Sequence, residues 1–138
     1  MSDRHVFVDT NILVYAHDAD AGKKHAAAKQ KIKALWQQNL PPSISIQVLQ
    51  ELYVNLVRKG AAAKTAREIV GDYLQWDVVV NDEDLLVEAM RLAERYKTSL
   101  WDASIIAAAK RAGAALVWSE NFSDKQEYEE VRVENPLR

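Results

Sequence analysis

The chain has 138 residues, a length typical of one domain, and 49% of them are hydrophobic, which supplies a core and excludes a disordered chain. It has no cysteine, which excludes disulfides, thiolate catalysis and cysteine-bound metal centres, so a metal ion can bind only through oxygen or histidine. No apolar run reaches the roughly 20 residues of a membrane helix, and no signal-peptide core follows the first residues. We therefore expect a single domain over residues 1–138, soluble and cytoplasmic, with no membrane partner.

The net charge of -2 is unevenly distributed along the chain. Residues 22–75 carry nine lysines and arginines and three acids, a net charge of +6, so the remainder carries -8. This asymmetry is consistent with a surface that faces a polyanion, although solvated helix faces give the same pattern.

The first half of the chain is predicted to alternate strands with helices. The run at 5–8 is β-branched and aromatic, as in a strand buried on both faces, and Pro41-Pro42 ends a Lys-, Ala- and Gln-rich helical stretch. Gly60 separates the two arms of a helical hairpin. In chain order, the expected elements are a strand at 5–8, helical segments from 12 and over 23–38, a strand at 43–46, and helices over 48–57 and 62–75.

The second half continues the alternation. Acids at 82–84 suit the positive end of a helix, and Gly113 is placed to end another. The expected elements are a strand at 76–80, helices over 81–96 and 99–112, a strand at 115–118 and a short strand at 131–133.

Nearly all-apolar strands that alternate with helices predict an α/β fold, a three-layer α/β/α arrangement around a central, mainly parallel sheet of four to five strands. In such sheets ligands bind at the carboxyl ends of the strands, near the point where the strand order reverses. Acidic residues at these ends are therefore the first candidates for a site.

Asp9 and Asp102 each have a structural and a functional interpretation. Asp9 directly follows the first strand, where it can cap the helix that starts at Thr10 or face the sheet edge. Asp102 lies in the first turn of an apolar helix, where the helix dipole stabilises an acid, but it also shares a face with buried positions. A buried carboxylate costs several kcal/mol unless it is paired or bound to a metal.

Glu51 lies at the margin of the apolar stripe of its helix, a place where glutamates are usually solvated. The segment after the last central strand offers Glu120 or Asp124 as a further acid. If these acids converge with Asp9 and Asp102, their mutual repulsion favours capture of a cation. Oxygen ligands suit Mg²⁺ or Mn²⁺, which would bind phosphate oxygens and activate a water for phosphodiester hydrolysis.

Four segments in this order resemble PIN-domain proteins, specifically the VapC-like toxins of bacterial toxin–antitoxin pairs. They are Phe7–Tyr15, Gln47–Tyr53, Leu100–Ala107 and Leu116–Phe122. The resemblance covers nearly the whole chain and implies a PIN-like fold and a Mg²⁺-dependent endoribonuclease (Mn²⁺ is an alternative ion). It also implies an RNA substrate, a homodimer and inhibition by a cognate antitoxin protein.

By position, Asp9, Glu51 and Asp102 match the first three acidic residues of the family, and Asp124 ranks first as the fourth, with Glu120 as the alternative. The resemblance implies that Asp9 and Asp102 hold the principal ion, while Glu51 and the fourth acid bind it through water or support a second ion. Whether one ion or two act stays open. Residues expected to orient these carboxylates, or to serve simply as helix caps, are Thr10, Asn11, Ser119 and Asn121.

Two other classes of function compete with the nuclease. One is a non-catalytic PIN-like module that binds RNA or protein. The other is a phosphotransfer domain of the receiver or haloacid-dehalogenase kind, which is disfavoured because Asn11 stands where the second acid of an Asp-x-Asp motif would be.

Trp101 and the turn of the helical hairpin are the remaining candidates for contacts with a partner. Trp101, beside Asp102, is the one tryptophan that we single out for a test of base stacking. The basic residues at the turn suit phosphate, although a solvated turn is the favoured interpretation, and the apolar stripe of the hairpin suits dimerisation or an antitoxin helix.

Overall fold

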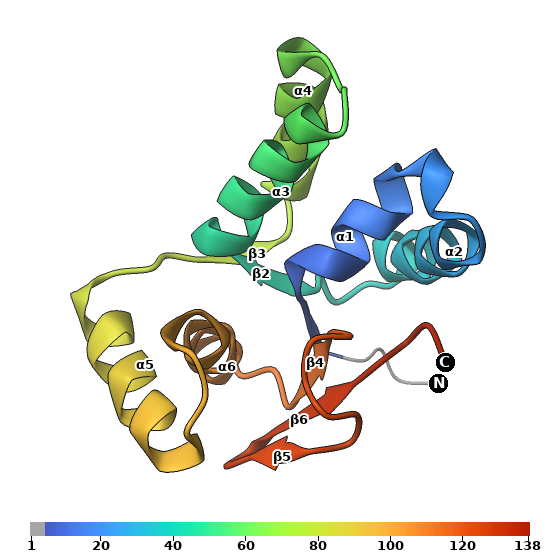
Figure 1. Cartoon of the computed structure of the whole chain (residues 1–138). Coiled ribbons are helices and arrows are strands. Elements are labelled where there is room, and N and C mark those ends of the chain that lie inside the picture. Colours follow the sequence, from blue (N-terminus) through green and yellow to red (C-terminus); the bar gives the residue numbers. More distant parts are fainter. Residues whose placement is uncertain (1–4) are drawn as a thin grey trace.

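The computed structural model describes residues 5–138 (Figure 1). Its helices are α1 (Thr10–His17), the short 3₁₀ helix η1 (Ala19–Ala21), α2 (Lys23–Gln37), α3 (Ile46–Arg58), α4 (Ala63–Tyr73), α5 (Glu83–Tyr96) and α6 (Leu100–Ala112). Its strands are β1 (Val6–Val8), β2 (Ser43–Ser45), β3 (Asp77–Val79), β4 (Leu116–Trp118), β5 (Glu127–Tyr128) and β6 (Val131–Glu134). None of the helices in this range is both long enough and apolar enough to cross a bilayer.

The strands form one sheet in the order β3-β2-β1-β4-β6-β5. All neighbouring pairs are parallel except β5 and β6, which are antiparallel. The sheet therefore has six strands rather than the four to five expected, because β5 has only two residues and makes a tight hairpin with β6 that leaves no apolar run in the sequence.

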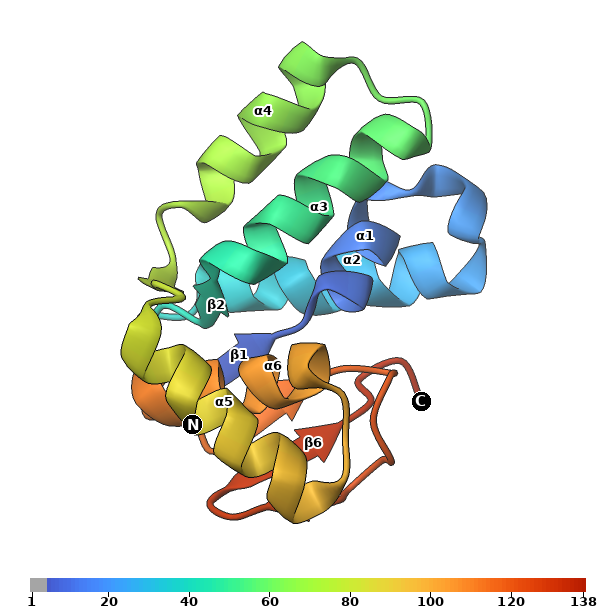
Figure 2. The ribbon, with the colours of Figure 1, turned by 60° about the vertical axis from the view of Figure 1, so that its left-hand side comes forward.

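The chain winds from β1 outward through β2 to β3, and then returns to place β4 on the other side of β1. Because parallel crossovers are right-handed, this reversal puts the connecting helices on opposite faces of the sheet. Figure 1 shows α5 and α6 on one side and α1 and α2 on the other, which confirms the predicted three-layer α/β/α arrangement. Helix α3 packs against α1, and α4 lies on the outer side of α3 (Figure 2).

The core lies around the two central strands. Every residue of β1 is buried, and so is every residue of β4. Helix α6 is buried on most of its surface because its alanines and two isoleucines let it lie close to the sheet on one side and to α5 on the other. The side chain of Ser99 caps α6, and Gly113 ends it in the left-handed conformation with a φ of 76°.

This topology fixes where a site can form. The strand order reverses between β1 and β4, so the carboxyl ends of these two strands, Val8 and Trp118, lie side by side in register. Residues that follow them are the ones that meet at the reversal point.

Candidate functional site

Asp9 directly follows β1, and hydrogen bonds hold both its backbone and its carboxylate in place. Its backbone N–H donates to the carbonyl of Trp118 at 3.0 Å, which ties it to the end of β4. Its Oδ1 accepts from the backbone N–H of Thr10 at 2.7 Å, and its Oδ2 accepts from the hydroxyl of Ser119 at 2.8 Å. Asp9 is thus both the N-cap of α1 and a carboxylate that is only 4% exposed.

The pKa of Asp9 is raised from its ordinary value of 3.8 to about 6. Burial is the largest cause, because the charged form loses its hydration. The hydrogen bonds from Ser119 and from the amide of Thr10 oppose this effect, while the carboxylates of Glu51 and Asp102 add to it by repulsion. Asp9 is therefore a buried acid whose charged form is disfavoured by burial and by repulsion from two neighbouring carboxylates.

Glu51 and Asp102 bring these charges from two other helices. Glu51, exposed on α3, accepts from the hydroxyl of Thr10 at 3.2 Å, and Asp102 is half-buried in the first turn of α6. Within residues 5–138, no lysine or arginine forms an ion pair with either acid or with Asp9. The structure thus places Glu51 and Asp102 near enough to Asp9 to act on its charge, and no lysine or arginine of the described residues is paired with the three acids.

Ser119 is the centre of a hydrogen-bond network that supports Asp9. Its fully buried hydroxyl donates to Asp9 and accepts from the side-chain amide of Asn11 at 3.3 Å and from the backbone N–H of Asn121 at 3.1 Å. The carbonyl oxygen of Asn11 in turn accepts from the backbone N–H of Glu120 at 3.3 Å. These bonds fix the loop after β4 against the start of α1.

The two candidates for a fourth acid are engaged elsewhere. Asp124 accepts from the backbone N–H of Asn135 at 2.8 Å and lies 3.7 Å from the guanidinium of Arg138, so its contacts are with the C-terminal segment. Glu120 accepts from the hydroxyl of Tyr15 and from Lys24. Neither acid is among the groups that shift the pKa of Asp9.

Electrostatics around Glu120 differ from those around Asp9. Burial acts to raise the pKa of Glu120, but the hydrogen bonds from Tyr15 and Lys24 outweigh it and hold the pKa below its ordinary value. The ammonium of Lys24 lies 3.1 Å from its carboxylate. Glu120 is therefore a carboxylate whose charge a neighbouring cation already balances.

A polar cavity of about 270 Å³ lies beside the acids, between α1 and α3. Among the residues that line it are Thr10, Asn11, Glu51, Asn55, Lys59 and Asn121. The sequence analysis did not single out Asn55 and Tyr15 as neighbours of the site. Asn55 lies one helical turn after Glu51, a spacing that points to it, whereas the contact of Tyr15 with Glu120 spans 105 residues and leaves no local signal.

The donor set can be compared with what a divalent cation requires. Among residues 5–138, no group of three acidic or histidine side chains is close enough to enclose a metal ion. Mg²⁺ keeps several of its waters and is commonly held by one or two carboxylates directly. A buried, unpaired Asp9 with two further carboxylates in electrostatic range fits an ion held in this way.

Comparison with known proteins identifies the family. A model of the PIN domain matches residues 6–125. The chain belongs to the PIN domain family. The match begins at β1 and ends beyond the loop that carries Ser119, so it includes Asp9, Glu51 and Asp102. A comparison with curated proteins finds no match.

Solved structures share the PIN fold of this chain. VapC20 of Mycobacterium tuberculosis, a toxin that cleaves the sarcin–ricin loop, is 21% identical, with a TM-score of 0.69 over 84% of this chain and 89% of that one. A toxin–antitoxin complex from Klebsiella pneumoniae contains a chain that is 23% identical, with a TM-score of 0.71 over 95% and 97%. FitAcB of Neisseria gonorrhoeae is 15% identical, with a TM-score of 0.60 over 95% and 97%.

Proposed function

We propose that this PIN domain is a metal-dependent endoribonuclease whose site is formed by Asp9, Glu51 and Asp102. The observation that carries the proposal is the buried carboxylate of Asp9, whose pKa is raised to about 6 beside two further acids that have no cationic partner within residues 5–138. The burial of Asp9 and the repulsion among the three carboxylates destabilise the folded protein, and a bound cation would offset this destabilisation. The PIN family and the toxin named among the similar structures support RNA as the substrate.

In this proposal Asp9 and Asp102 would hold a Mg²⁺ or Mn²⁺ ion, and Glu51 would support it through water. When bound, such an ion supplies a ligand for phosphate oxygens and makes a water molecule acidic enough to attack phosphorus. Ser119 and Thr10 keep the carboxylates of Asp9 and Glu51 in fixed orientations through their hydroxyl groups. The neighbouring polar cavity gives the RNA phosphate access to Glu51 from the solvent side.

Asp124 stays the first choice for the fourth acid on its spacing from Ser119. It can reach an ion only if its carboxylate leaves the backbone N–H of Asn135. Glu120 is the alternative, and it would have to leave Lys24. Both steps require a rearrangement of the loop after β4, which the binding of an ion and of RNA would have to drive.

Digestion of RNA by the purified protein tests this proposal. We expect total RNA to be cleaved with Mg²⁺ and not with EDTA, and Asp9→Asn and Asp102→Asn to lose at least 100-fold in rate, in the range that the loss of a metal's contribution implies. Asp84→Asn is the matched control, because Asp84 is an exposed acid in the first turn of α5. Equal cleavage by Asp9→Asn and the wild type would refute the site.

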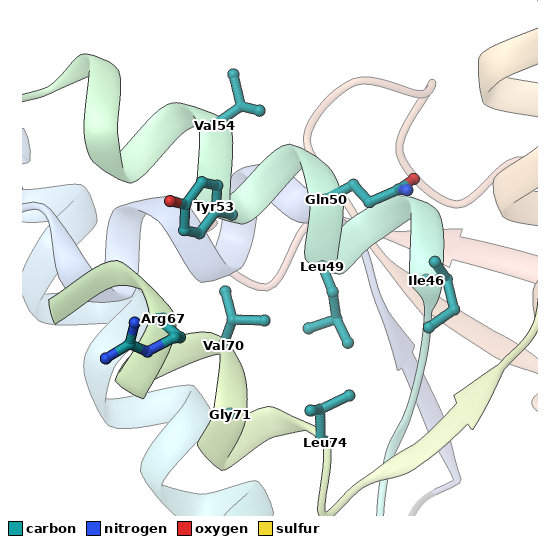
Figure 3. Close-up of a pocket in the computed structure, with 9 residues that line it drawn as sticks. All are labelled: Ile46, Leu49, Gln50, Tyr53, Val54, Arg67, Val70, Gly71 and Leu74. Atoms are coloured by element: carbon teal, nitrogen blue, oxygen red, sulfur yellow. The ribbon is translucent and has the colours of Figure 1, made fainter. Parts of the chain in front are cut away.

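We further propose that the protein acts in the cytoplasm as the toxin of a toxin–antitoxin pair, as a homodimer. An apolar groove of about 620 Å³ lies between α3 and α4. Figure 3 shows Leu49 and Tyr53 on α3, Val70 on α4 and Leu74 directly after α4 around this groove. Tyr53 and Leu74 are 38% and 56% exposed, so an amphipathic antitoxin helix would bury surface that is otherwise in water.

Growth of a bacterial host that expresses the chain tests the toxin role. Wild-type protein is expected to arrest growth, and Asp9→Asn is expected not to. Co-expression of the product of the neighbouring reading frame is expected to restore growth. Growth that is equally slow with both variants would show a burden of expression and contradict the toxin role.

A non-catalytic RNA- or protein-binding module is the second candidate. One observation favours it: Asp9 already caps α1 and bonds to Ser119, a structural role that needs no ion. This candidate predicts that Mn²⁺ does not bind in a way that depends on Asp9 or Asp102, whereas the nuclease predicts that it does.

A further inference from the structure

Trp101 has a surface position unlike that of the other tryptophans. It is 68% exposed, the largest value among the exposed large hydrophobic side chains of residues 5–138. Trp76 and Trp118 are buried, and the partly exposed Trp36 packs against Tyr73 and Trp76. Leu86, which lines the same groove, is also exposed, so Trp101 belongs to an exposed apolar patch near the proposed site, as is typical of a binding surface.

Trp101 lines a groove of about 600 Å³ that lies between the first turns of α3 and α6 and the loop before α5. We name it the Trp101 groove, and it includes Gln47, Gln50, Asn81, Leu86, Leu100 and Trp101. Apolar side chains form part of its wall, three side chains carry amides, and the acids Asp82 and Glu83 also line it. This composition differs from that of the α3–α4 groove, which is almost entirely apolar.

Two residues that line the Trp101 groove are close in the chain to acids of the proposed site. Trp101 directly precedes Asp102 on α6, and Gln47 lies one helical turn before Glu51 on α3. The side-chain amide of Gln47 donates to the backbone carbonyl of Trp101 at 3.4 Å, so the two walls are in contact. The groove therefore shares α3 and α6 with Glu51 and Asp102.

The side-chain amides of Gln47 and Asn81 form hydrogen bonds within the wall of the groove, which leaves the amide of Gln50 for a ligand. The backbone N–H of Gln47 donates to Oδ1 of Asn81 at 3.0 Å, which fixes the loop before α5 against the start of α3. The side-chain amide of Gln50 has no hydrogen-bond partner within residues 5–138. Aromatic stacking combined with hydrogen bonds to the base edge is how proteins recognise unpaired RNA bases.

We propose that the Trp101 groove binds an unpaired nucleobase of the RNA next to the scissile phosphate, stacked on Trp101 with its edge toward Gln47 and Gln50. This inference rests on the proposed ribonuclease function and adds a base-binding subsite to it. A base inside a duplex cannot enter, because its edge is paired and its faces are stacked.

Binding without cleavage tests the groove. We would measure the fluorescence anisotropy of 5′-labelled pentamers of A, C or U, and of a pentamer with abasic riboses, with protein in EDTA. The wild type is expected to bind at least one base-bearing pentamer more tightly than the abasic one. Trp101→Leu is expected to lose about tenfold in that affinity, Trp101→Phe less, and neither to change abasic binding.

Tyr53→Leu is the matched control, because Tyr53 is an exposed aromatic residue in the other groove. It is expected to bind all pentamers as the wild type does. Equal affinity of the wild type for base-bearing and abasic pentamers would overturn the proposal, and so would unchanged affinity in Trp101→Leu. A change of oligomeric state in Trp101→Leu with unchanged RNA affinity would assign the groove to a protein partner and also overturn it.

The outcome is separable from that of the ribonuclease proposal. Base-dependent binding that needs Trp101, in a protein that does not cleave RNA with Mg²⁺, would support the groove and refute the nuclease. Cleavage with Mg²⁺ by a protein whose RNA affinity is indifferent to Trp101 would support the nuclease and refute the groove.

Discussion

Replacement of Asp9 by Asn in the metal-free protein is expected to increase stability at neutral pH. The pKa of Asp9 is about 6 in the folded protein, against an ordinary value of 3.8. Between these two values the folded state binds a proton that the unfolded state releases, so the free energy of unfolding falls as the pH rises. The difference of roughly two pKa units corresponds to about 3 kcal/mol of destabilisation at pH 7, and it is absent below pH 4.

The amide of Asn recovers only part of this free energy. Its oxygen can accept from the backbone N–H of Thr10, but its NH₂ would face the hydroxyl of Ser119, which already accepts from Asn11 and Asn121. The loss of one good hydrogen bond costs about 1 kcal/mol. The net gain at pH 7.5 is therefore about 1 to 2 kcal/mol, and at pH 4 the variant is less stable by about 1 kcal/mol.

Urea unfolding of both proteins in EDTA from pH 4 to pH 8 measures this difference. Asp124→Ala is the control with the opposite sign, because it removes the acceptor for the backbone N–H of Asn135 and should destabilise at pH 7 by about 1 kcal/mol. A stability difference between Asp9→Asn and the wild type that does not change with pH would refute the argument that burial and neighbouring acids shift the pKa of Asp9.

Three further predictions concern other side chains. Ser119→Ala removes the hydroxyl that donates to Asp9, so it should destabilise the metal-free protein at pH 7 by about 1 to 3 kcal/mol in urea melts and by less at pH 4. For the fourth acid, Asp124→Asn should reduce the rate of RNA cleavage more than Glu120→Gln does, and the reverse order would move the assignment to Glu120. Lys110→Met should destabilise the protein by about 1 kcal/mol at low salt and by less at 1 M NaCl, because Lys110 forms an ion pair with Glu129 at 2.6 Å. A loss of stability that does not depend on salt would show that packing of the Lys110 side chain matters more than its charge.

Much of the fold follows from periodicity and from residues that start and stop helices. The apolar run at 5–8 is β1, and the helix expected over 99–112 is α6, bounded by Ser99 and Gly113 as capping rules predict. The strand that sequence reasoning missed, β5, has two residues, which is too short to show a hydrophobic periodicity. Its place is fixed by hydrogen bonds to β6 alone.

The arrangement of the residues around the candidate site was predictable to the extent that sheet topology determines it. Asp9 follows a central strand, and the reversal between β1 and β4 brings the loop with Ser119 to it. The environment of Asp124 could not be predicted from the sequence. Its hydrogen-bond partner, Asn135, lies on the C-terminal segment after β6, and no local sequence pattern links the two residues. The same holds for Lys24, whose partner Glu120 is 96 residues away.

The structure also changes the interpretation of the basic region over 22–75, because part of its positive charge is paired with nearby acids. Lys24 is paired with Glu120, and Lys59 lies 3.2 Å from Asp18 at the edge of the polar cavity. Two of the nine basic side chains thus balance local acids. The charge asymmetry of the sequence is therefore partly internal pairing, and only the remaining lysines and arginines are available to an RNA backbone.

Calorimetric titration of the purified protein with Mn²⁺ tests the central claim most directly, because it asks whether the three acids bind a cation. The account predicts binding at pH 7.5 that Asp9→Asn and Asp102→Asn abolish, that Glu51→Gln weakens, and that Asp84→Asn leaves unchanged. Binding that is the same in the wild type and in Asp9→Asn, or no binding by the wild type, would contradict it.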